Sequence, residues 1–556
     1  MSIIELFASV ALLLVPLFFY LTRNSRSKAP SKSNPKSYPL IGSSAAIFAN
    51  RNRTTQWTSD LIQSSPTVTV VLRRFLDDTR VFTGNPANVQ HILKTKFYDY
   101  EKGSKSRQTL FDFLGNGIFN IDGDSWKFQR QVSSHEFNTK SLRKFMETVV
   151  DTEVSQRLIP ILSTAAANNT VLDLQDILQR FAFDNICKIA FGHDPAYLLP
   201  DLPEAEFAKT FDDAAKISSG RKKKQELSNK PSLETVDLLS RFLSSGHSDE
   251  DFVTDIVISF ILAGRDTTSA ALTWYFWLLS QNPEIEKEIL REIKDKSESP
   301  VYEEVKDMVY THASLCESMR LYPPVPIDGK VALRDDVLPD GTVIKKGMRV
   351  LYHPYAMGRL EMLWGPDWEE FKPDRWLQRA GDGVSNDGKW SFVGRDPYSY
   401  PVFQAGPRIC LGKDMAFLQM KRVVAGILRR FKVVPAAEDG VEPVFVSFAT
   451  SKMEGGFPVS PNLTAEQTGE DNSSMQGDSP VSNGSLPAHG MSSASFGKHQ
   501  TLMEGWEALE FDRNFLEHAF NSLQSGKEGL QFVQEITNHL QELWKLGMRN
   551  TSWSAP

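Results

Sequence analysis

The stretch Phe403-Gln-Ala-Gly406-Pro-Arg408-Ile-Cys410-Leu-Gly412 decides how the rest of this chain is interpreted. Gly406 and Gly412 let the backbone pass close to a flat and bulky group, and Cys410 stands at the start of a predicted helix. Unpaired N–H groups at a helix start favour a thiolate and lower the pKa of a cysteine there. Hydrogen bonds from the same amides tune a metal that the sulfur binds. Arg408 can direct its planar fork to a carboxylate, and Phe403 can cover the sulfur side.

A second interpretation of Cys410 is a nucleophilic cysteine with a histidine base, which spacing alone leaves open. No helical segment is rich in histidine, however, and a glycine-flanked cysteine near an arginine suits a macrocycle better. Cys187 and Cys316 are far from Cys410 and from each other in the sequence, which argues against a four-cysteine zinc site and against a disulfide framework. We expect both to be small, buried, apolar residues.

The bulk composition describes a large globular protein. The chain has 556 residues, of which 41% are hydrophobic and 24% are charged, and its formal net charge is −7. A chain of this length can bury a large core. The acidic balance argues against a nucleic-acid partner.

The N-terminal segment predicts a membrane anchor over residues 1–22. Ile3 to Leu21 is almost wholly apolar and reaches the lower part of the length that spans a bilayer. The linker that follows, residues 23–41, is rich in Lys, Arg and Pro, which predicts a stiff connector and a body on the cytosolic side. A cleaved signal peptide is the alternative, but no convincing basic segment precedes the apolar run.

Residues 42–461 read as one large, mainly helical body with small sheets. Long helices are expected at Leu142–Leu162, Asp251–Leu279 and Ala416–Phe431. Strand-like pieces occur at Val68–Leu72, Val337–Val343 and Met348–Tyr352, and Pro339-Asp340-Gly341 has the composition of a turn.

The composition changes after Pro461. Residues 462–500 are rich in small and polar side chains and predict a disordered linker. Apolar residues then recur at helical spacing, which predicts a small helical tail over residues 501–548. This tail is either an interaction module on a tether or a helix pair that docks on the body.

The pattern Phe-x-x-Gly-x-Arg-x-Cys-x-Gly at residues 403–412 resembles the haem-binding signature of the cytochrome P-450 superfamily. The resemblance implies a mainly α cytochrome P-450 fold with small β-sheets and an N-terminal transmembrane helix. It implies a monooxygenase that uses O2, haem b, and electrons from NADPH supplied by NADPH–cytochrome P-450 reductase. Cys410 would be the axial ligand of the haem iron, with four further residues of the loop at the haem: Phe403, Gly406, Arg408 and Gly412.

Other motifs of the superfamily follow in the expected order. Ala263–Thr268 lies inside a long apolar helix, where a glycine lets the helix bulge and leaves a groove beside a ligand. The resemblance assigns oxygen activation and proton delivery to Thr267 and Asp266, in line with general acid chemistry. The alternative is a capped break between two helices.

Two further motifs concern the haem surroundings. Glu317 and Arg320 share one helix face, and the resemblance places them with Arg375 in a buried structural network. Trp126 and Arg130 stand one helical turn apart as donors suited to the haem propionates, and Lys330 is a further propionate contact on positional grounds.

Several stretches resemble the plant fatty-acid ω-hydroxylase branch, from Asp124–Gln131 and His135–Asn138 to Val331–Gly341 and Tyr355–Arg359. The resemblance implies hydroxylation of the terminal or near-terminal carbon of medium- and long-chain fatty acids in the endoplasmic reticulum membrane, with the catalytic domain in the cytosol. The alternative substrate is a jasmonoyl–amino acid conjugate, oxidised at its ω-carbon. The expected wall of an acyl-chain pocket, with ordinary core as the alternative, consists of Phe111, Phe113, Leu114, Ile118 and Phe119.

The chain departs from the branch in two places. The segment between Asp212 and Leu239 is shorter than the family pattern, which trims the roof of the substrate channel. The tail after Pro461 is not predicted by the family, and a fused reading frame is one alternative origin for it. An inactive relative that acts through its tail is therefore the competing function of another class.

Overall fold

The computed structural model describes residues 35, 37, 42–74, 79–137, 139–203, 211, 250–379, 390–436, 442–447 and 449–463. The predicted anchor over residues 1–22, the shortened segment after Asp212 and the predicted helical tail over residues 501–548 lie outside these ranges. In the described part of the chain, no helix has both the length and the apolar character needed to cross a membrane.

Helices make up most of the described chain. In the first half they are α2 Ser44–Ala49, α3 Thr54–Ser64, α4 Pro86–Gln90, α5 Ser104–Leu114, α6 Gly123–Ser134, α7 Thr139–Phe145, α8 Asp151–Glu153, α9 Ile159–Ala167 and α10 Leu174–Phe191. In the second half they are α13 Glu250–Ile261, α14 Thr267–Ser280, α15 Pro283–Lys294, α16 Tyr302–Lys306, α17 Val309–Leu321, α18 Pro354–Met357, α19 Glu361–Trp364 and α20 Lys413–Leu428.

The strands form small sheets. The largest has the order β1-β2-β8-β5-β3, with bounds Thr69–Arg73, Thr79–Thr83, Arg349–Tyr352, Asp328–Ala332 and Tyr100–Glu101. Within it only β2 and β8 run parallel. The remaining strands are β4 Leu172–Asp173, β6 Asp336–Val337, β7 Val343–Ile344, β9 Leu377–Arg379, β10 Trp390–Phe392, β11 Phe431–Pro435, β12 Phe445–Ser447, β13 Ser451–Met453 and β14 Pro458–Leu463.

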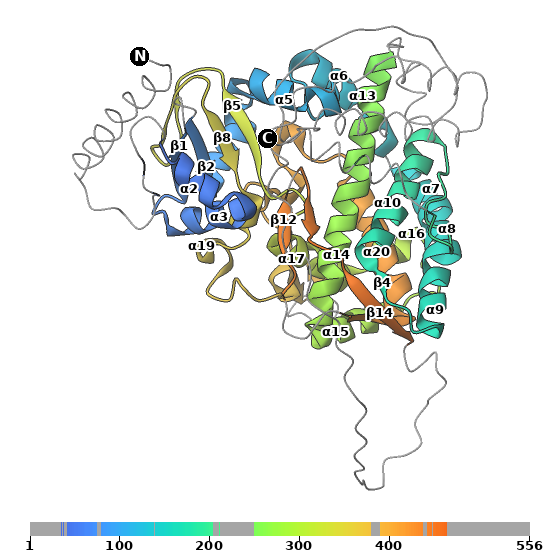
Figure 1. Ribbon diagram of the computed structural model, residues 1–556. Helices are drawn as coiled ribbons and strands as arrows, with labels where there is room; N and C mark the ends of the chain where they lie inside the picture. Colours follow the sequence, from blue (N-terminus) through green and yellow to red (C-terminus); the bar gives the residue numbers. More distant parts are fainter. Residues whose placement is uncertain are drawn as a thin grey trace, which may run out of the picture.

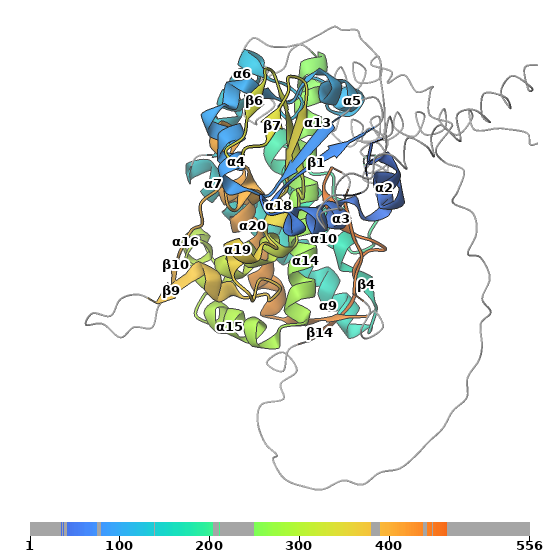
Figure 2. The ribbon, with the colours of Figure 1, turned by 90° about the vertical axis from the view of Figure 1, so that its left-hand side faces the viewer.

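The sheet and the helices occupy different sides of the molecule. Figure 1 shows the sheet of β1, β2, β5 and β8 with α2 and α3 on one side, and the column of α13 and α14 with α10 and α20 on the other. The sheet side faces the viewer in Figure 2, where β1, α2 and α3 lie in front of α10 and α14. In the view of Figure 1, α13 and α14 stand between this sheet and the helices α7, α8 and α9.

The α13–α14 column is buried because most of its large side chains are apolar. Trp274, Tyr275 and Phe276 of α14 are fully buried in the largest core cluster. Between the two helices, Leu262–Asp266 forms a π-helical turn, so the column widens without breaking. The expected bulge is therefore present, and the alternative of two separately capped helices is wrong.

The predicted elements agree with the structure except at one strand and at one helix end. Helical structure covers Leu142–Leu162 and Asp251–Leu279, and α20 covers the predicted C-terminal helix as far as Leu428, because Phe431 already begins β11. The strands expected at Val68–Leu72 and Met348–Tyr352 are β1 and β8. The piece Val337–Val343 is instead a hairpin, in which β6 and β7 pair across the Pro339-Asp340-Gly341 turn, because a turn of this type reverses the chain within a few residues.

Candidate active site

The loop before α20 holds Cys410 in a closed backbone arrangement. The Cys410 amide donates to the Phe403 carbonyl at 2.8 Å, which joins the two ends of the motif. Gly406 has φ +66°, and a Cβ at this position would lie 2.1 Å from the Leu93 carbonyl oxygen. A residue with a side chain therefore does not fit at Gly406. At Gly412 an added Cβ would meet only ordinary contacts, so lack of space requires a glycine at position 406 and not at position 412.

The environment of the Cys410 thiol differs from the expectation. The residue is exposed by its surface area, yet protein atoms surround the sulfur closely enough that burial raises the pKa of the thiol above its ordinary value. The Gly412 amide, Arg130 and Lys413 favour the thiolate and only partly offset this effect. The predicted lowering of the pKa is thus wrong for the protein alone, because desolvation outweighs the helix start. A coordinated metal deprotonates a thiol outright, and none of the groups that favour the thiolate is a histidine base.

Three predicted haem contacts meet beside this loop. The guanidinium carbons of Arg408 and Arg130 lie 4.4 Å and 5.9 Å from the centre of the Trp126 ring. Arg130 also donates to the Ile409 carbonyl at 2.6 Å, which ties α6 to the cysteine loop. We call Trp126, Arg130, Lys330 and Arg408 the Arg408 cluster.

The Arg408 cluster contains polar atoms that the protein does not satisfy. Lys330 is 2% exposed, and its Nζ has no hydrogen-bond partner among the described residues. Burial and the nearby charges of Lys102 and Arg408 hold the pKa of Lys330 well below its usual range. The Nε of Arg408 is buried and equally unsatisfied within the described chain, although its Nη2 pairs with Asp122 at 2.7 Å. Buried donors of this kind call for an acceptor, so a ligand with carboxylates, such as haem with its propionates, fits these residues.

The other side of the candidate site is the π-helical turn between α13 and α14. The Thr267 hydroxyl donates to the Ala263 carbonyl at 2.6 Å, across the widened turn. Asp266 is buried and forms an ion pair with Arg265 at 2.9 Å, while the Thr450 hydroxyl lies 3.5 Å from its second oxygen. The turn therefore carries a hydroxyl and a charged carboxylate side by side in the chain.

Gly264 also packs closely against a neighbouring helix. A Cβ on Gly264 would lie 2.6–2.8 Å from the side chain of Ile186 on α10. The glycine thus permits close packing of α10 against the turn, because no larger residue fits there. The groove that the sequence predicts beside a ligand at this turn stays a prediction.

Glu317, Arg320 and Arg375 lie together in a buried network, which we call the Glu317 cluster. Arg320 donates to both carboxylate oxygens of Glu317 at 2.8 Å, and Arg375 donates to the same carboxylate at 3.1 Å. The Trp376 indole completes the carboxylate at 2.9 Å. The remaining donors of Arg320 reach the backbone carbonyls of Gly358, Trp368 and Glu370.

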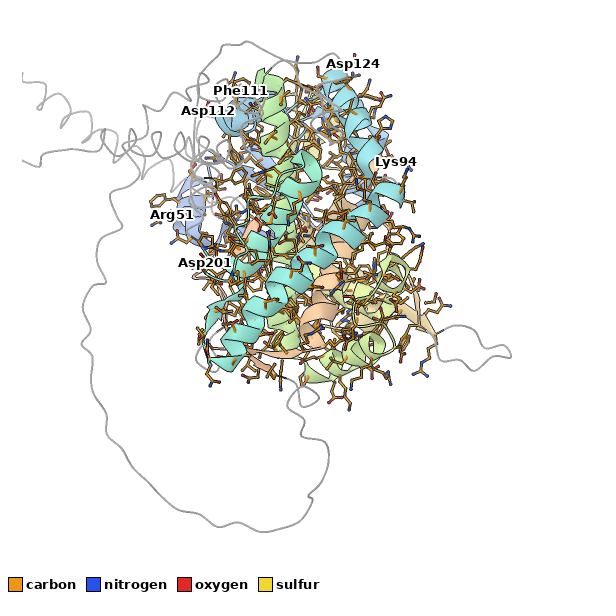
Figure 3. All side chains as sticks on the ribbon, turned by 90° about the vertical axis from the view of Figure 1, so that its right-hand side faces the viewer. Arg51, Lys94, Phe111, Asp112, Asp124 and Asp201 are labelled. Atoms are coloured by element: carbon orange, nitrogen blue, oxygen red, sulfur yellow. The ribbon has the colours of Figure 1, made fainter. Side chains whose placement is uncertain are left out.

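The expected pocket residues differ in how deeply they are buried. Phe113 and Leu114 are buried in an apolar cluster with side chains of α10 and α13, and Phe111 and Ile118 are half-buried. Phe119 is 39% exposed. Figure 3 places Phe111 beside the end of α13, which α5 also contacts. The structure brings Phe113 and Leu114 against α13 and leaves Phe119 at the surface.

Sequence reasoning missed the residues that connect the cysteine loop and the Arg408 cluster to strand β5. Asp122, Lys102 and Asp328 link the Arg408 cluster electrostatically, and Tyr352 and Gln404 contact Asp328. Gln404 lies inside the quoted motif, where it was treated as a spacer. Only the strand pairing of β5 with β8 brings Asp328 opposite Tyr352.

Three features of this site are typical of the haem-thiolate monooxygenases. They are the cysteine loop before α20, the Arg408 cluster with its unsatisfied donors, and the π-helical turn between α13 and α14. A family model described as "Cytochrome P450" matches residues 66–219 and 204–457. The chain belongs to the cytochrome P450 family. As a member it is a monooxygenase that uses haem iron and electrons supplied from NADPH by a reductase.

Three relatives illustrate the similarity. "Cytochrome P450 94A2" of Vicia sativa is 59% identical over 491 residues, which covers 80% of this chain and 95% of the relative. "Cytochrome P450 94A1" of Vicia sativa is 59% identical over 464 residues, with coverage of 76% and 90%. "Cytochrome P450 94B1" of Arabidopsis thaliana is 44% identical over 502 residues, with coverage of 82% and 97%.

The first alignment bears on the shortened segment. Its 491 positions exceed the 80% of this 556-residue chain that it covers, so the relative contains residues that this chain lacks. This agrees with the expected internal loss.

Proposed function

We propose that this chain hydroxylates the terminal or near-terminal carbon of medium- and long-chain fatty acids. The observation that carries the proposal is the apolar cluster of Phe113, Leu114, Ile186, Phe260 and Leu262, which extends from α5 and α10 to the π-helical turn. We expect these apolar side chains to form one wall of the substrate pocket, because an apolar wall suits an acyl chain whose end reaches the reacting centre. The resemblance of the chain to the fatty-acid ω-hydroxylase branch supports the same substrate class.

In this proposal the Arg408 cluster holds the haem by its propionates and Cys410 binds the iron. Lys330 and Arg408 contribute the unsatisfied donors, and Trp126 and Arg130 complete the set. When bound, the haem supplies reductive activation of O2 and insertion of one oxygen atom into a C–H bond. Phe403 and the Gly406 turn hold the loop that presents the sulfur.

Asp266 and Thr267 handle protons in the proposed reaction. The Thr267 hydroxyl is held by the Ala263 carbonyl and can exchange that partner for a reacting oxygen. Asp266, oriented by Arg265 and Thr450, is a carboxylate that can take up a proton from water and pass it to this hydroxyl as the hydroxyl gives its own proton to the reacting oxygen. Asp266 ends the widened turn and Thr267 begins α14, so the two side chains lie next to each other where the helix changes its geometry.

We further propose that residues 1–22 anchor the protein in the endoplasmic reticulum membrane as a single span, with the body in the cytosol. Residues 23–41 would then be a stiff linker, residues 42–461 the catalytic domain, residues 462–500 a flexible linker and residues 501–548 a helical tail. The apolar and then basic character of the N-terminus supports the orientation.

The first experiment is the absorption difference spectrum of the reduced, carbon-monoxide-bound protein. A strongly red-shifted Soret band that is lost in Cys410→Ala is expected, because only a thiolate ligand produces that shift in the proposed site. A band at the ordinary position in the unsubstituted protein would overturn haem ligation by Cys410.

The second experiment tests the substrate. Saturated fatty acids of graded length are added to the holoenzyme with NADPH and its reductase, beside a jasmonoyl–amino acid conjugate. Terminal hydroxylation of the fatty acids, identified by mass spectrometry, is expected. Turnover of the conjugate alone would show that the conjugate, and not a fatty acid, is the substrate. A red-shifted Soret band without turnover of either compound would favour the hypothesis of an inactive relative.

A further inference from the structure

Gln404, the residue after Phe403 in the cysteine loop, has an unusual backbone. Its φ is 62° and its ψ is 179°, a conformation that is populated almost only by glycine because a Cβ crowds the backbone. A residue with a long side chain at such a position needs contacts elsewhere that hold it there. The conformation therefore directs attention to what the Gln404 side chain touches.

The side chain of Gln404 reaches two residues of the sheet. Its amide nitrogen donates to Asp328 at 2.5 Å, and its amide oxygen lies within hydrogen-bond distance of the Tyr352 hydroxyl. That hydroxyl is also 2.8 Å from Asp328, and its single hydrogen serves one acceptor at a time. Burial and the neighbouring Asp328 raise the pKa of Tyr352 well above its usual range, so the hydroxyl keeps this hydrogen.

The sheet fixes both partners of Gln404. Asp328 on β5 and Tyr352 on β8 are directly paired across the two strands. Asp328 also accepts from Lys102 at 3.1 Å and from the Gly329 amide at 2.6 Å, so its carboxylate is held from several directions. Gln404 is thus anchored to rigid structure rather than to another loop.

The contacts of Gln404 with Asp328 and Tyr352 connect the cysteine loop to the strand that carries Lys330. The Phe403 carbonyl, which belongs to the peptide that joins residues 403 and 404, accepts the Cys410 amide. Rotation of the Gln404 backbone would therefore move the acceptor that closes the loop around the sulfur. On the other side, Lys330 lies two residues after Asp328 on β5, and side chains two apart share one face of a strand.

We propose that Gln404 is a positioning residue for Cys410, which holds the closed cysteine loop in register with the strand that carries Lys330. The inference rests on the proposed haem ligation by Cys410. It predicts that the Asp328–Tyr352–Gln404 contacts set how strongly the haem is held and which electronic properties the thiolate gives it, because residues that orient a metal ligand tune the metal.

The test compares Gln404→Ala and Gln404→Gly in the full-length holoenzyme. Gln404→Ala removes the anchor and keeps the backbone strain, and we expect haem affinity to fall roughly 10- to 100-fold. The reduction potential should also shift, and part of the red-shifted Soret band of the reduced carbon-monoxide complex should be lost. Gln404→Gly removes the anchor and the strain together, so its changes should have the same direction and be smaller.

Tyr352→Phe is a second variant that keeps the ring packing and removes only the hydroxyl. It should shift the reduction potential in the same direction as Gln404→Ala and by less, since Gln404 retains its bond to Asp328. Gln175→Ala is the matched control, because Gln175 is also buried and exchanges two hydrogen bonds with the Met453 backbone. The control should lower the unfolding temperature and leave the potential and the Soret position unchanged.

The outcomes separate this inference from the proposed function. If Gln404→Ala and Gln404→Gly retain haem, Soret position and reduction potential like the unsubstituted protein, Gln404 does not position Cys410. Equal spectral changes in Gln175→Ala would also overturn the inference, since they would reflect general loosening. If the unsubstituted protein lacks the band that Cys410→Ala abolishes, the haem ligation itself fails.

Discussion

Two buried arginine clusters of this molecule differ in how completely the protein satisfies them. In the Glu317 cluster, Arg320 has a carboxylate or a carbonyl for each side-chain nitrogen. In the Arg408 cluster, Lys330 Nζ and Arg408 Nε have no hydrogen-bond acceptor among the described residues. Both clusters are rich in cations and largely shielded from solvent, so residue type alone does not separate them.

The difference identifies which cluster is framework and which is a binding site. A fully satisfied cluster already has its acceptors, and another ligand could only displace them at a cost. A buried cluster of unsatisfied cations destabilises the fold until an anion binds to it. The hydrogen bonds to that anion are then strong, because the protein around them has a low dielectric constant. We therefore expect the Glu317 cluster to matter for folding with or without haem, and the Arg408 cluster to matter in opposite ways in the two states.

The largest effect is expected for Glu317→Gln. The substitution keeps the shape but leaves two buried guanidinium groups without their shared charge, so the free energy of unfolding should fall by about 3–5 kcal/mol. Guanidinium chloride unfolding, measured with and without haem, should show the same loss in both. A loss found only in the haem-loaded protein would break the comparison.

Lys421 offers a third kind of buried cation, which among the described residues is held by carbonyls and by no carboxylate. Its Nζ donates to Val305 and Lys306 at 3.2 Å and 2.9 Å, and burial lowers its pKa from 10.5 to about 8. Between these two values the unfolded chain binds more protons than the folded one, so stability should rise with pH over that window. The rise should amount to about 3 kcal/mol relative to Lys421→Met.

Unfolding of the unsubstituted protein and of Lys421→Met at pH values from about 7.5 to about 10.5 checks the Lys421 prediction, because this range covers the window between the two pKa values. Below pH 8 their difference should be constant. A constant difference through the whole series would show that the Lys421 ammonium is not desolvated as the fold requires.

Lys330→Met should produce changes of opposite sign in the two states. Without haem, removal of an unsatisfied buried donor should raise the free energy of unfolding by about 1–3 kcal/mol. With haem, loss of a propionate contact should lower haem affinity. Thermal unfolding of both forms, beside a haem-transfer assay, measures the two effects, and destabilisation of the haem-free form would place Lys330 in the framework.

The smallest effect is expected for Lys127→Ala. Lys127 pairs with Asp124 at 2.9 Å on the surface of α6, on the same helix as Trp126 and Arg130. Both side chains are exposed, so solvent screens the pair and no measurable change in unfolding or haem retention should follow. A clear loss of haem in this variant would extend the Arg408 cluster to the surface of α6.

Much of this site could be predicted from the sequence because its motifs are short. Trp126 with Arg130, and Glu317 with Arg320, each share a helix face, and the family resemblance of the cysteine loop then gave these pairs their roles. The helical column and its bulge followed from apolar composition and one glycine. The role of Gly264 did not, because Ile186 is distant in sequence and only the packing of α10 brings it near.

The same limit explains the other differences. The contacts of Gln404 depend on which strands pair, and β5 and β8 are joined by a pairing that local sequence does not specify. The pKa of Cys410 depends on how much protein surrounds the sulfur, which is a property of the whole fold. Burial and strand pairing are long-range quantities, so they escape a reading of neighbouring residues.

The pairing of β5 with β8 also determines which kinds of genetic change this site can survive. Asp328 and Lys330 face the site together because they are two residues apart on one strand. Insertion or deletion of a single residue at position 329 would put them on opposite faces, while replacement of either side chain leaves the other one facing the site. In the evolution of such a chain, strand β5 would therefore tolerate substitutions more readily than changes of length.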